Sequence, residues 1–415
     1  MDGTNGIYVN PEFEDDRLGK RVSDAGDVNH DGFADVILGA TGSDANGLNC
    51  GAAYVLFGKA AFTSTSIELA DLNGQDGIKI KGAIASDYAG RGVSGLGDVN
   101  GDGFGDVLIG APYVNGTSGA AYLVFGKAAF TTSSLELSSL DGTNGAVFQG
   151  TVFPDSSGRF VSGTGDVNGD GFADMLIGSW YSGINGDRSG KADLVFGRST
   201  FTTAPIQLAS LDGTNGITFV GGTAGDKAGF SVSDLGDVNA DGIADFAITA
   251  RDESLSGTIS GACYVVSGFS PVFAPKLKVS LNFAKPDADS IALKGMIGIP
   301  AGFSPLGQTV SFSVGGTTDS LVLDAKGKAT SGTTSFKLKI KSKKGVVAAQ
   351  DARFSLARKK GSFGASLADE GLIDATLSNL PVEIGVLLSA GKLYHALVTQ
   401  TYTATQGKSG KTKSY

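Results

Sequence analysis

The sequence VSDAGDVNHDGFADVILGA (residues 22–40) returns three more times along the chain. Its copies are VSGLGDVNGDGFGDVLIGA (93–111), VSGTGDVNGDGFADMLIGS (161–179) and VSDLGDVNADGIADFAITA (232–250). Successive copies start 71, 68 and 71 residues apart. A long fixed period of this kind is the sequence signature of a repeat architecture.

Two shorter phrases recur in step with this stretch. One is GAAYVLFG (51–58), which returns at 119–126, 190–197 and 261–268. The other is MDGTNGI at the start of the chain, which returns at 72–78, 140–146 and 211–217. Together the phrases divide the chain into four repeats, near residues 1–71, 72–139, 140–210 and 211–272.

Each repeat reads as four short strands separated by turn signals, in the first repeat at residues 7–10, 21–24, 36–39 and 52–57. Four strands per repeat are typical of a propeller blade. The alternative is an elongated β-solenoid, whose repeats are usually shorter than about 70 residues. We therefore expect an all-β chain with four propeller blades, in an open or strained arc rather than a sealed ring.

Composition excludes several classes of protein. The 415 residues include two Cys, which cannot form a disulfide framework or a Cys-rich zinc site, and two His, which leave little room for His-based catalysis. Even if the blades close, Cys50 and Cys263 occupy different repeat positions, so we expect no disulfide between them. No stretch reaches the roughly 18 apolar residues of a membrane span. The chain is predicted not to be an enzyme.

The charge divides the chain into an acidic and a basic part. Residues 1–274 carry 14 Lys and Arg against 33 Asp and Glu, a net charge of −19, and residues 275–415 carry 19 against 9, a net charge of +10. The acidic part is predicted to hold cations and not to bind nucleic acid. In the basic part, an alternating run places charges on one strand face, which either is solvated or contacts an anionic surface. The run is Lys337, Lys339, Lys341, Lys343 and Lys344.

The densest motif is DxNxDGxxD, which occurs once per repeat. Oxygen side chains at positions 1, 3 and 5, followed by Gly at 6, match the start of a calcium-binding loop. Position 7 would add a backbone carbonyl while its apolar side chain turns into the blade, and Asp at 9 would close the shell. The predicted ligands are Asp27, Asn29, Asp31, Phe33 and Asp35; Asp98, Asn100, Asp102, Phe104 and Asp106; Asp166, Asn168, Asp170, Phe172 and Asp174; and Asp237, Asn239, Asp241, Ile243 and Asp245.

Ordinary Asn/Asp/Gly turns are the alternative for these loops, because turns favour the same residues. Three carboxylates crowded together would repel one another without a cation, which favours metal binding. Magnesium fits less well than calcium because it keeps several waters. The sequence therefore predicts up to four Ca²⁺ ions, one per loop. His30, at a variable loop position, is expected to be solvated.

The dipeptides Phe57-Gly58, Phe125-Gly126 and Phe196-Gly197, together with Gly110-Ala111-Pro112, resemble FG-GAP repeats. Such repeats build the propeller of integrin α subunits and of many bacterial secreted proteins. The resemblance implies one calcium ion in a hairpin loop of each blade. It also implies that Trp180 and Tyr181 lie on the face that meets ligands, although packing between blades is an equal alternative. This sequence departs from the family in having four repeats instead of seven and Ser267 in place of Phe.

Beyond the repeats, residues 273–286 are predicted to be a linker, 287–405 a β-sandwich accessory domain and 406–415 a basic disordered tail. The chain as a whole is predicted to be a non-catalytic, calcium-binding adhesion protein with a protein or glycan ligand, outside the cell or at its surface. The alternatives are an accessory propeller of a secreted phospholipase or polysaccharide-degrading enzyme, and a purely structural surface component. Residues 1–10 contain no signal peptide, so we expect the chain to begin at an internal Met with blades missing upstream.

Overall fold

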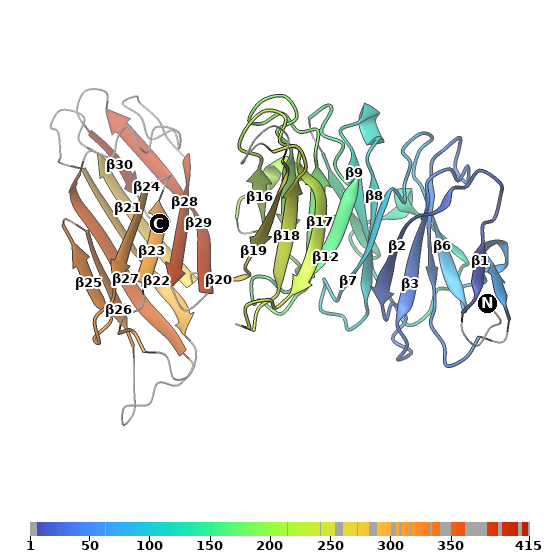
Figure 1. Ribbon diagram of the computed structural model, residues 1–415, viewed down its shortest axis with the longest axis horizontal. Coiled ribbons are helices and arrows are strands. Elements are labelled where there is room, and N and C mark those ends of the chain that lie inside the picture. Colours follow the sequence, from blue (N-terminus) through green and yellow to red (C-terminus); the bar gives the residue numbers. More distant parts are fainter. Residues whose placement is uncertain are drawn as a thin grey trace. The chain divides into compact units, whose positions relative to one another are not determined.

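The computed structural model describes residues 6–413, apart from 63, 151, 214, 241, 254–259, 272, 282–288, 300–303, 307–308, 315–316, 333, 341–349, 362–379, 389–391 and 406–408. The chain forms two compact units, of which the first contains nearly all of residues 1–266 and the second contains Ser267–Tyr415. Both are built from strands and short turns, so the all-β prediction is confirmed (Figure 1). No helix in the described part is long and apolar enough to cross a bilayer.

The first unit is a row of antiparallel blades (Figure 1). Blade 1 contains β2 (Leu18–Gly26), β3 (Asp35–Ala40), β4 (Ala52–Leu56) and β6 (Gly77–Lys81). Blade 2 contains β7 (Gly92–Gly97), β8 (Asp106–Ala111), β9 (Ala120–Val124) and β11 (Gly145–Gln149). Blade 3 contains β12 (Phe160–Gly165), β13 (Asp174–Ser179), β14 (Lys191–Val195) and β16 (Gly216–Val220). In the described residues, blade 4 has three strands: β17 (Ala228–Gly236), β18 (Asp245–Ala250) and β19 (Ala262–Val266).

The blades are offset from the sequence repeats. The outermost strand of blade 1, β6, belongs to the second repeat, and β11 and β16 follow the same rule. Short parallel strands then extend the outer edges: β10 (Ser134–Glu136) pairs with β6, and β15 (Ile206–Gln207) pairs with β11. The first predicted strand, β1 (Tyr8–Asn10), does not join blade 1 but pairs with β5 (Ser66–Glu68). Single 3-10 turns directly follow β5, β10 and β15, at η1 (Leu69–Asp71), η3 (Leu137–Ser139) and η4 (Leu208–Ser210), and a further one, η2 (Val114–Gly116), lies between β8 and β9.

The core lies between neighbouring blades. In β8 every residue is buried, and Val107 and Ile109 pack in one cluster with residues of blade 1. Leu108 packs in another cluster with Met175 and Ile177 of blade 3. Strands covered on both faces read as continuous apolar runs rather than as alternating patterns, which explains the VLIGA segment of β8.

One glycine per blade lets the next blade approach closely. A Cβ atom on Gly110 would lie 1.7 Å from the carbonyl oxygen of Gly158, and one on Gly39 would lie 2.1 Å from that of Gly90. The equivalent residue in blade 4 is Thr249, and no further repeat follows blade 4 in the sequence. The glycine of the Gly-Ala phrase therefore serves the contact between blades.

The arc is open at its first blade. Strands β2, β7, β12 and β17 pack against one another in that order. Val22 is 63% exposed and Val36 is 41% exposed, whereas the equivalent Val93 and Val107 of blade 2 are 6% and 1% exposed. The leading face of blade 1 is therefore uncovered, in agreement with an open arc. Cys50 is buried and Cys263 is exposed, and both are free thiols.

The second unit is a separate group of eleven hydrogen-bonded strands. The long strand β29 pairs with β28 from Lys392 to Gln400 and with β30 from Thr401 to Thr405. The segment predicted as a linker includes β21, and the segment predicted as a tail includes β30. The strands are β20 (Phe269–Pro271), β21 (Phe273–Leu281), β22 (Asp289–Ile299), β23 (Thr309–Val314), β24 (Thr317–Val322), β25 (Lys328–Ser331), β26 (Thr334–Lys339), β27 (Gln350–Gly361), β28 (Leu380–Leu388), β29 (Lys392–Thr405) and β30 (Ser409–Lys413).

Candidate metal centre

Each DxNxDGxxD loop connects the innermost strand of a blade to the second strand. The loops of blades 1 and 2 span residues 27–34 and 98–105, between β2 and β3 and between β7 and β8. The glycine at position 6 has a left-handed backbone in all four loops, with φ between 86° and 94° at Gly32, Gly103, Gly171 and Gly242. Glycine adopts this conformation without steric cost, so it allows the chain to fold back over the side chains at positions 1, 3 and 5.

The loop of blade 2 shows how these side chains are held. The backbone N–H of Asp102 donates to Asp98 Oδ1 (3.1 Å) and to Asn100 Oδ1 (2.9 Å). The other Asp98 oxygen accepts the N–H of Gly103 at 2.8 Å. Asn100 Nδ2 donates to Asp102 Oδ2 at 2.8 Å. Three oxygen-bearing side chains therefore gather around one turn of backbone.

The same hydrogen bonds recur in blades 1 and 3. The N–H of Asp31 donates to Asp27 Oδ1 and Asn29 Oδ1 at 3.0 and 3.1 Å. In blade 3 the N–H of Asp170 makes the equivalent bonds at 3.1 and 2.9 Å. In blade 4, Gly242 donates to Asp237 Oδ2 at 2.7 Å, and Asp241 lies outside the described residues.

The Asp at position 9 has a second task that the sequence did not reveal. Asp106 is buried, and its two oxygens accept the N–H groups of Val99 (2.9 Å) and Gly126 (3.0 Å). Asp35 and Asp174 bind Gly58 and Gly197 in the same way, each at 2.8 Å. The carboxylate thus fastens the loop to the Phe-Gly turn, and the nearly constant spacing between the two motifs is the signal that could have indicated this.

The position-9 carboxylates of blades 1, 2 and 3 have raised pKa values. Burial raises the pKa of Asp106 to about 7, against two N–H bonds that lower it, and the charges of Asp102 and Asp98 raise it further. Burial likewise raises the pKa of Asp174 to about 8 and of Asp35 to about 6. In blades 1, 2 and 3 the third carboxylate of the loop therefore lies in a less hydrated environment.

Position 7 was expected to turn its side chain into its own blade. Instead, the Phe104 ring meets His30 of the preceding loop, with ring centroids 5.7 Å apart. A Cβ on Gly101 would lie 2.8 Å from the Phe172 ring, so the next pair of loops meets similarly. Phe33 is exposed because no blade precedes it in the described residues. His30 is exposed, as expected, and one edge of its ring also contacts the next blade.

The donor set of each loop fits a hard divalent cation. Calcium takes six to eight oxygen ligands from carboxylates, amides, carbonyls and water. Each carboxylate has about four lone-pair sites, and Asp102 accepts one N–H on each oxygen, from Asn100 Nδ2 (2.8 Å) and from the backbone of Phe104 (3.0 Å). In the described part of the chain, no three His, Cys, Asp or Glu side chains converge as a metal-binding group. Because Asp106 is held by two amides, the oxygens around the turn come from two carboxylates and one Asn.

The other candidate residues of the sequence analysis have different surroundings. Trp180 is buried, and its ring lies 5.5 Å from that of Phe230 in the next repeat, so it packs between blades. Tyr181 is partly exposed beside it. In the second unit, Lys337 and Lys339 lie on the exposed face of β26, as the alternating pattern predicted, and the remaining lysines of that run lie outside the described residues.

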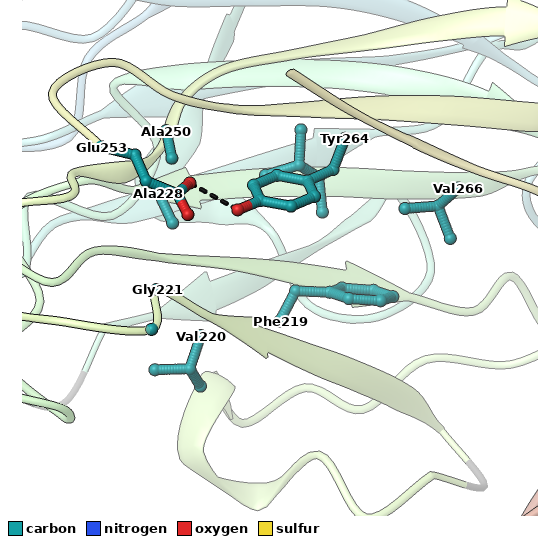
Figure 2. Close-up of a pocket in the computed structure, with 10 residues that line it drawn as sticks. Phe219, Val220, Gly221, Ala228, Ala250, Glu253, Tyr264 and Val266 are labelled. Atoms are coloured by element: carbon teal, nitrogen blue, oxygen red, sulfur yellow. Dashed lines mark hydrogen bonds between the residues drawn. The ribbon is translucent and has the colours of Figure 1, made fainter. Parts of the chain in front are cut away.

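A second candidate site is an apolar cavity of about 210 Å³ between β16 and blade 4 (Figure 2). Tyr264 points across it and donates a hydrogen bond to Glu253, which raises the pKa of Tyr264 to about 12. The equivalent Tyr54 and Tyr122 are buried. Among the described strands, none pairs with the outer edge of β19, which leaves Tyr264 partly exposed.

Comparisons with known proteins identify the repeats. The FG-GAP repeat family matches residues 22–56 and 89–124. Mouse integrin alpha-2 is 34% identical over 123 residues, which is 30% of this chain and 10% of that protein. Integrin alpha pat-2 of Caenorhabditis elegans is 35% identical over 95 residues, or 23% of this chain and 7% of that protein.

Chicken integrin alpha-6 is 26% identical over 163 residues, which is 38% of this chain and 13% of that protein. The chain thus spans only a small part of the length of these relatives. The matched segments contain the second half of β2 with β3 and β4, and the strands β7, β8 and β9, with the DxNxDGxxD loops of both blades. Two segments of this chain thus match the FG-GAP repeat family.

Proposed function

We propose that this chain is a non-catalytic, calcium-binding adhesion protein that presents a ligand-binding propeller surface. FG-GAP repeats of the integrin alpha type support an extracellular ligand-binding role. The observation that carries the calcium proposal is that three loops, in three blades, hold the same Asp-Asn-Asp oxygens with the same hydrogen bonds.

Electrostatics supports the same proposal. Residues 1–274 have a net charge of −19, and four Ca²⁺ ions would change it to −11. The oxygens at positions 1 and 5 are partly or fully exposed in blade 2, so an ion can reach them from solvent. An ion that binds only the folded loops stabilises the fold by about 2.7 kcal/mol per site at a hundredfold excess over its dissociation constant. Calcium would thus strengthen the junctions at which neighbouring loops touch.

Calorimetric titration and thermal unfolding of the full chain test this proposal. Calcium should bind with a stoichiometry of up to four and raise the unfolding temperature of the propeller, whereas sodium at equal ionic strength should not. Asp102→Ala should abolish one site, and Asp102→Asn should weaken it less because an amide oxygen remains. Asp71→Ala is the matched control, since Asp71 is an exposed carboxylate outside the loops.

A stoichiometry near zero, together with identical unfolding curves in calcium and in chelator, would return the loops to ordinary turns. Loss of calcium binding in the Asp71 variant would show that net charge, and not loop coordination, attracts the ion.

A further inference from the structure

A cavity of about 300 Å³ lies between blades 1 and 2, at the strand ends opposite the DxNxDGxxD loops. Arg17 directly precedes β2 and Lys20 lies near its start, residues 88–91 lead into β7, and residues 41 and 113 follow β3 and β8. We call this cavity the basic pocket. Its lining residues are Arg17, Lys20, Thr41, Tyr88, Arg91 and Tyr113.

The cations of the basic pocket have no anionic partner in the described part of the chain. None of the ion pairs found there includes Arg17, Lys20 or Arg91. Burial lowers the pKa of Arg91, and the charges of Arg159 and Arg21 lower it further. The three cations of the pocket and the neighbouring Arg21 and Arg159 therefore make five positive groups within a unit whose net charge is strongly negative.

Blade 4 shows how the chain neutralises such groups elsewhere. Lys227 and Arg251 occupy the positions of Tyr88 and Pro112, and both form ion pairs with Asp252. The residue equivalent to Asp252 in blade 2 is Tyr113. Where blade 4 supplies a carboxylate, the basic pocket supplies an aromatic ring, so its positive charge is left available to a ligand.

The aromatic part of the pocket is also specific. The rings of Tyr88 and Tyr113 lie 5.1 Å apart with an interplanar angle of 57°, and Tyr113 is 38% exposed. Arg17 and Tyr88 both have a left-handed backbone, with φ of 54° and 53°, and so do Ser156 and Lys227 at the equivalent positions of blades 3 and 4. The turn is therefore common to the repeats, and what distinguishes the pocket is the guanidinium of Arg17 and the ring of Tyr88.

We propose that the basic pocket binds an acidic polysaccharide, through a uronate carboxylate or a sulfate group held by Arg17 and Arg91. The guanidinium fork matches planar or tetrahedral oxyanions, and the two Tyr rings provide flat apolar surfaces with a polar end for a sugar ring. This proposal names a ligand class for the ligand-binding role given above and rests on that role.

The surroundings of the pocket favour a polymer with repeated charges. Outside the pocket, Arg21 lies over the Phe160 ring at 5.0 Å and Arg159 lies over the Trp180 ring at 5.1 Å. Neither forms an ion pair in the residues that the structure describes, so each can contact a further anionic group of the same polysaccharide. The net charge of −19 on residues 1–274 opposes the approach of every polyanion, and most strongly that of a nucleic acid, which carries a phosphate at every nucleotide.

Calorimetry of the full chain in calcium, at physiological ionic strength, tests the proposal. Hyaluronan oligosaccharides offer carboxylates, and chondroitin sulfate offers sulfates as well, so the pair separates the two sources of charge. Binding of at least one is expected, with no binding of dextran and at least about tenfold weaker binding of poly-glutamate and oligo-thymidine. The double variant Arg17→Ala/Arg91→Ala should lose about tenfold or more in affinity, since it removes two charge-assisted contacts.

Lys59→Ala/Lys127→Ala is the matched control, because it removes the same charge from residues at the opposite strand ends. It should bind within about twofold of the wild type, the span expected when no contact is lost. Tyr113→Leu should weaken binding several-fold with no change in charge. The proposal fails if neither polysaccharide binds, if poly-glutamate or oligo-thymidine binds equally well, or if the control weakens binding as much as the arginine variant. Calcium titration of the same samples shows separately whether the loops function.

Discussion

Blades 1 and 2 present the same residues on their leading faces, but only blade 2 buries them. Val22 and Val36 are exposed, whereas Val93 and Val107 are covered by blade 1. The same holds in the loops, where Phe33 is exposed and Phe104 packs against His30. In a repeat protein, stability is approximately a sum of repeat and interface contributions. The stabilising effect of a residue is therefore set by its neighbouring blade as much as by its own type.

The largest expected contrast is between Val107→Asp and Val36→Asp, which place a carboxylate at equivalent positions. Val107 is buried between blades, so Val107→Asp should lower the free energy of unfolding by about 4 kcal/mol or more. Val36→Asp should cost less than about 1 kcal/mol because water already reaches the site. Urea unfolding of the propeller measures both. Equal losses would mean that Val36 is covered in solution.

Blade 3 extends the comparison through a buried ion cluster. Lys191 Nζ lies 3.0 Å from Asp193 Oδ2 and 3.7 Å from Asp155 Oδ2, and all three residues are buried. Blades 1 and 2 have Ala and Tyr in place of Lys191 and Asp193. Lys191→Ala should cost about 3–5 kcal/mol because it leaves two buried carboxylates without their cation. Lys191→Ala/Asp193→Tyr, which restores the pattern of blades 1 and 2, should recover part of that loss.

The pH dependence of the single variant provides an independent check. The Lys191 charge lowers the pKa values of Asp155 and Asp193, which burial raises. Without that charge, both native-state pKa values rise further, so the folded state binds more protons than the unfolded state. The stability of Lys191→Ala should then fall more steeply than that of the wild type as pH rises. Parallel pH profiles would contradict the role of the cluster.

The smallest expected effect concerns Asp87, the blade 2 equivalent of Asp155. Asp87 has no cation among the influences on its pKa, which burial raises to about 6, and its Oδ2 is buried without a hydrogen-bond partner in the described structure. Because the folded pKa exceeds the unfolded value, the stability contribution of Asp87 is greatest below pH 4 and is lost as pH rises through 6. Asp87→Asn should flatten the stability profile between pH 4 and 6. An unchanged slope would show that Asp87 reaches solvent.

The sequence predicted the features that depend on local chemistry. Strand length, the turn at Gly103 and the oxygen side chains of the loops follow from residue types at short spacing. The period did not show that blades and repeats are out of phase, because a repeated pattern has no intrinsic starting point. The pairing of β6 with β4, rather than of β1 with β2, depends on contacts made after the chain folds.

Contacts between segments distant in the sequence could not be predicted for a similar reason. The bonds from Asp35 to Gly58 connect two motifs that read as independent in the sequence. The basic pocket is assembled from two repeats at positions where the repeats differ, so the recurring sequence pattern does not include Arg17 and Arg91. Trp180, in contrast, follows from the family resemblance as a residue of the ligand-meeting face or of the packing between blades, and the structure shows the packing.

The offset between blades and repeats has a mechanical consequence. Strand β6 pairs with β4 of blade 1, and the chain then continues directly into β7, the innermost strand of blade 2. A pulling force along the chain cannot separate these blades without shearing the five-residue ladder between β4 and β6. Among the described strands, no strand of a following repeat pairs with blade 4, so blade 4 should unfold first under a pulling force. Each earlier blade would then resist until its own ladder shears.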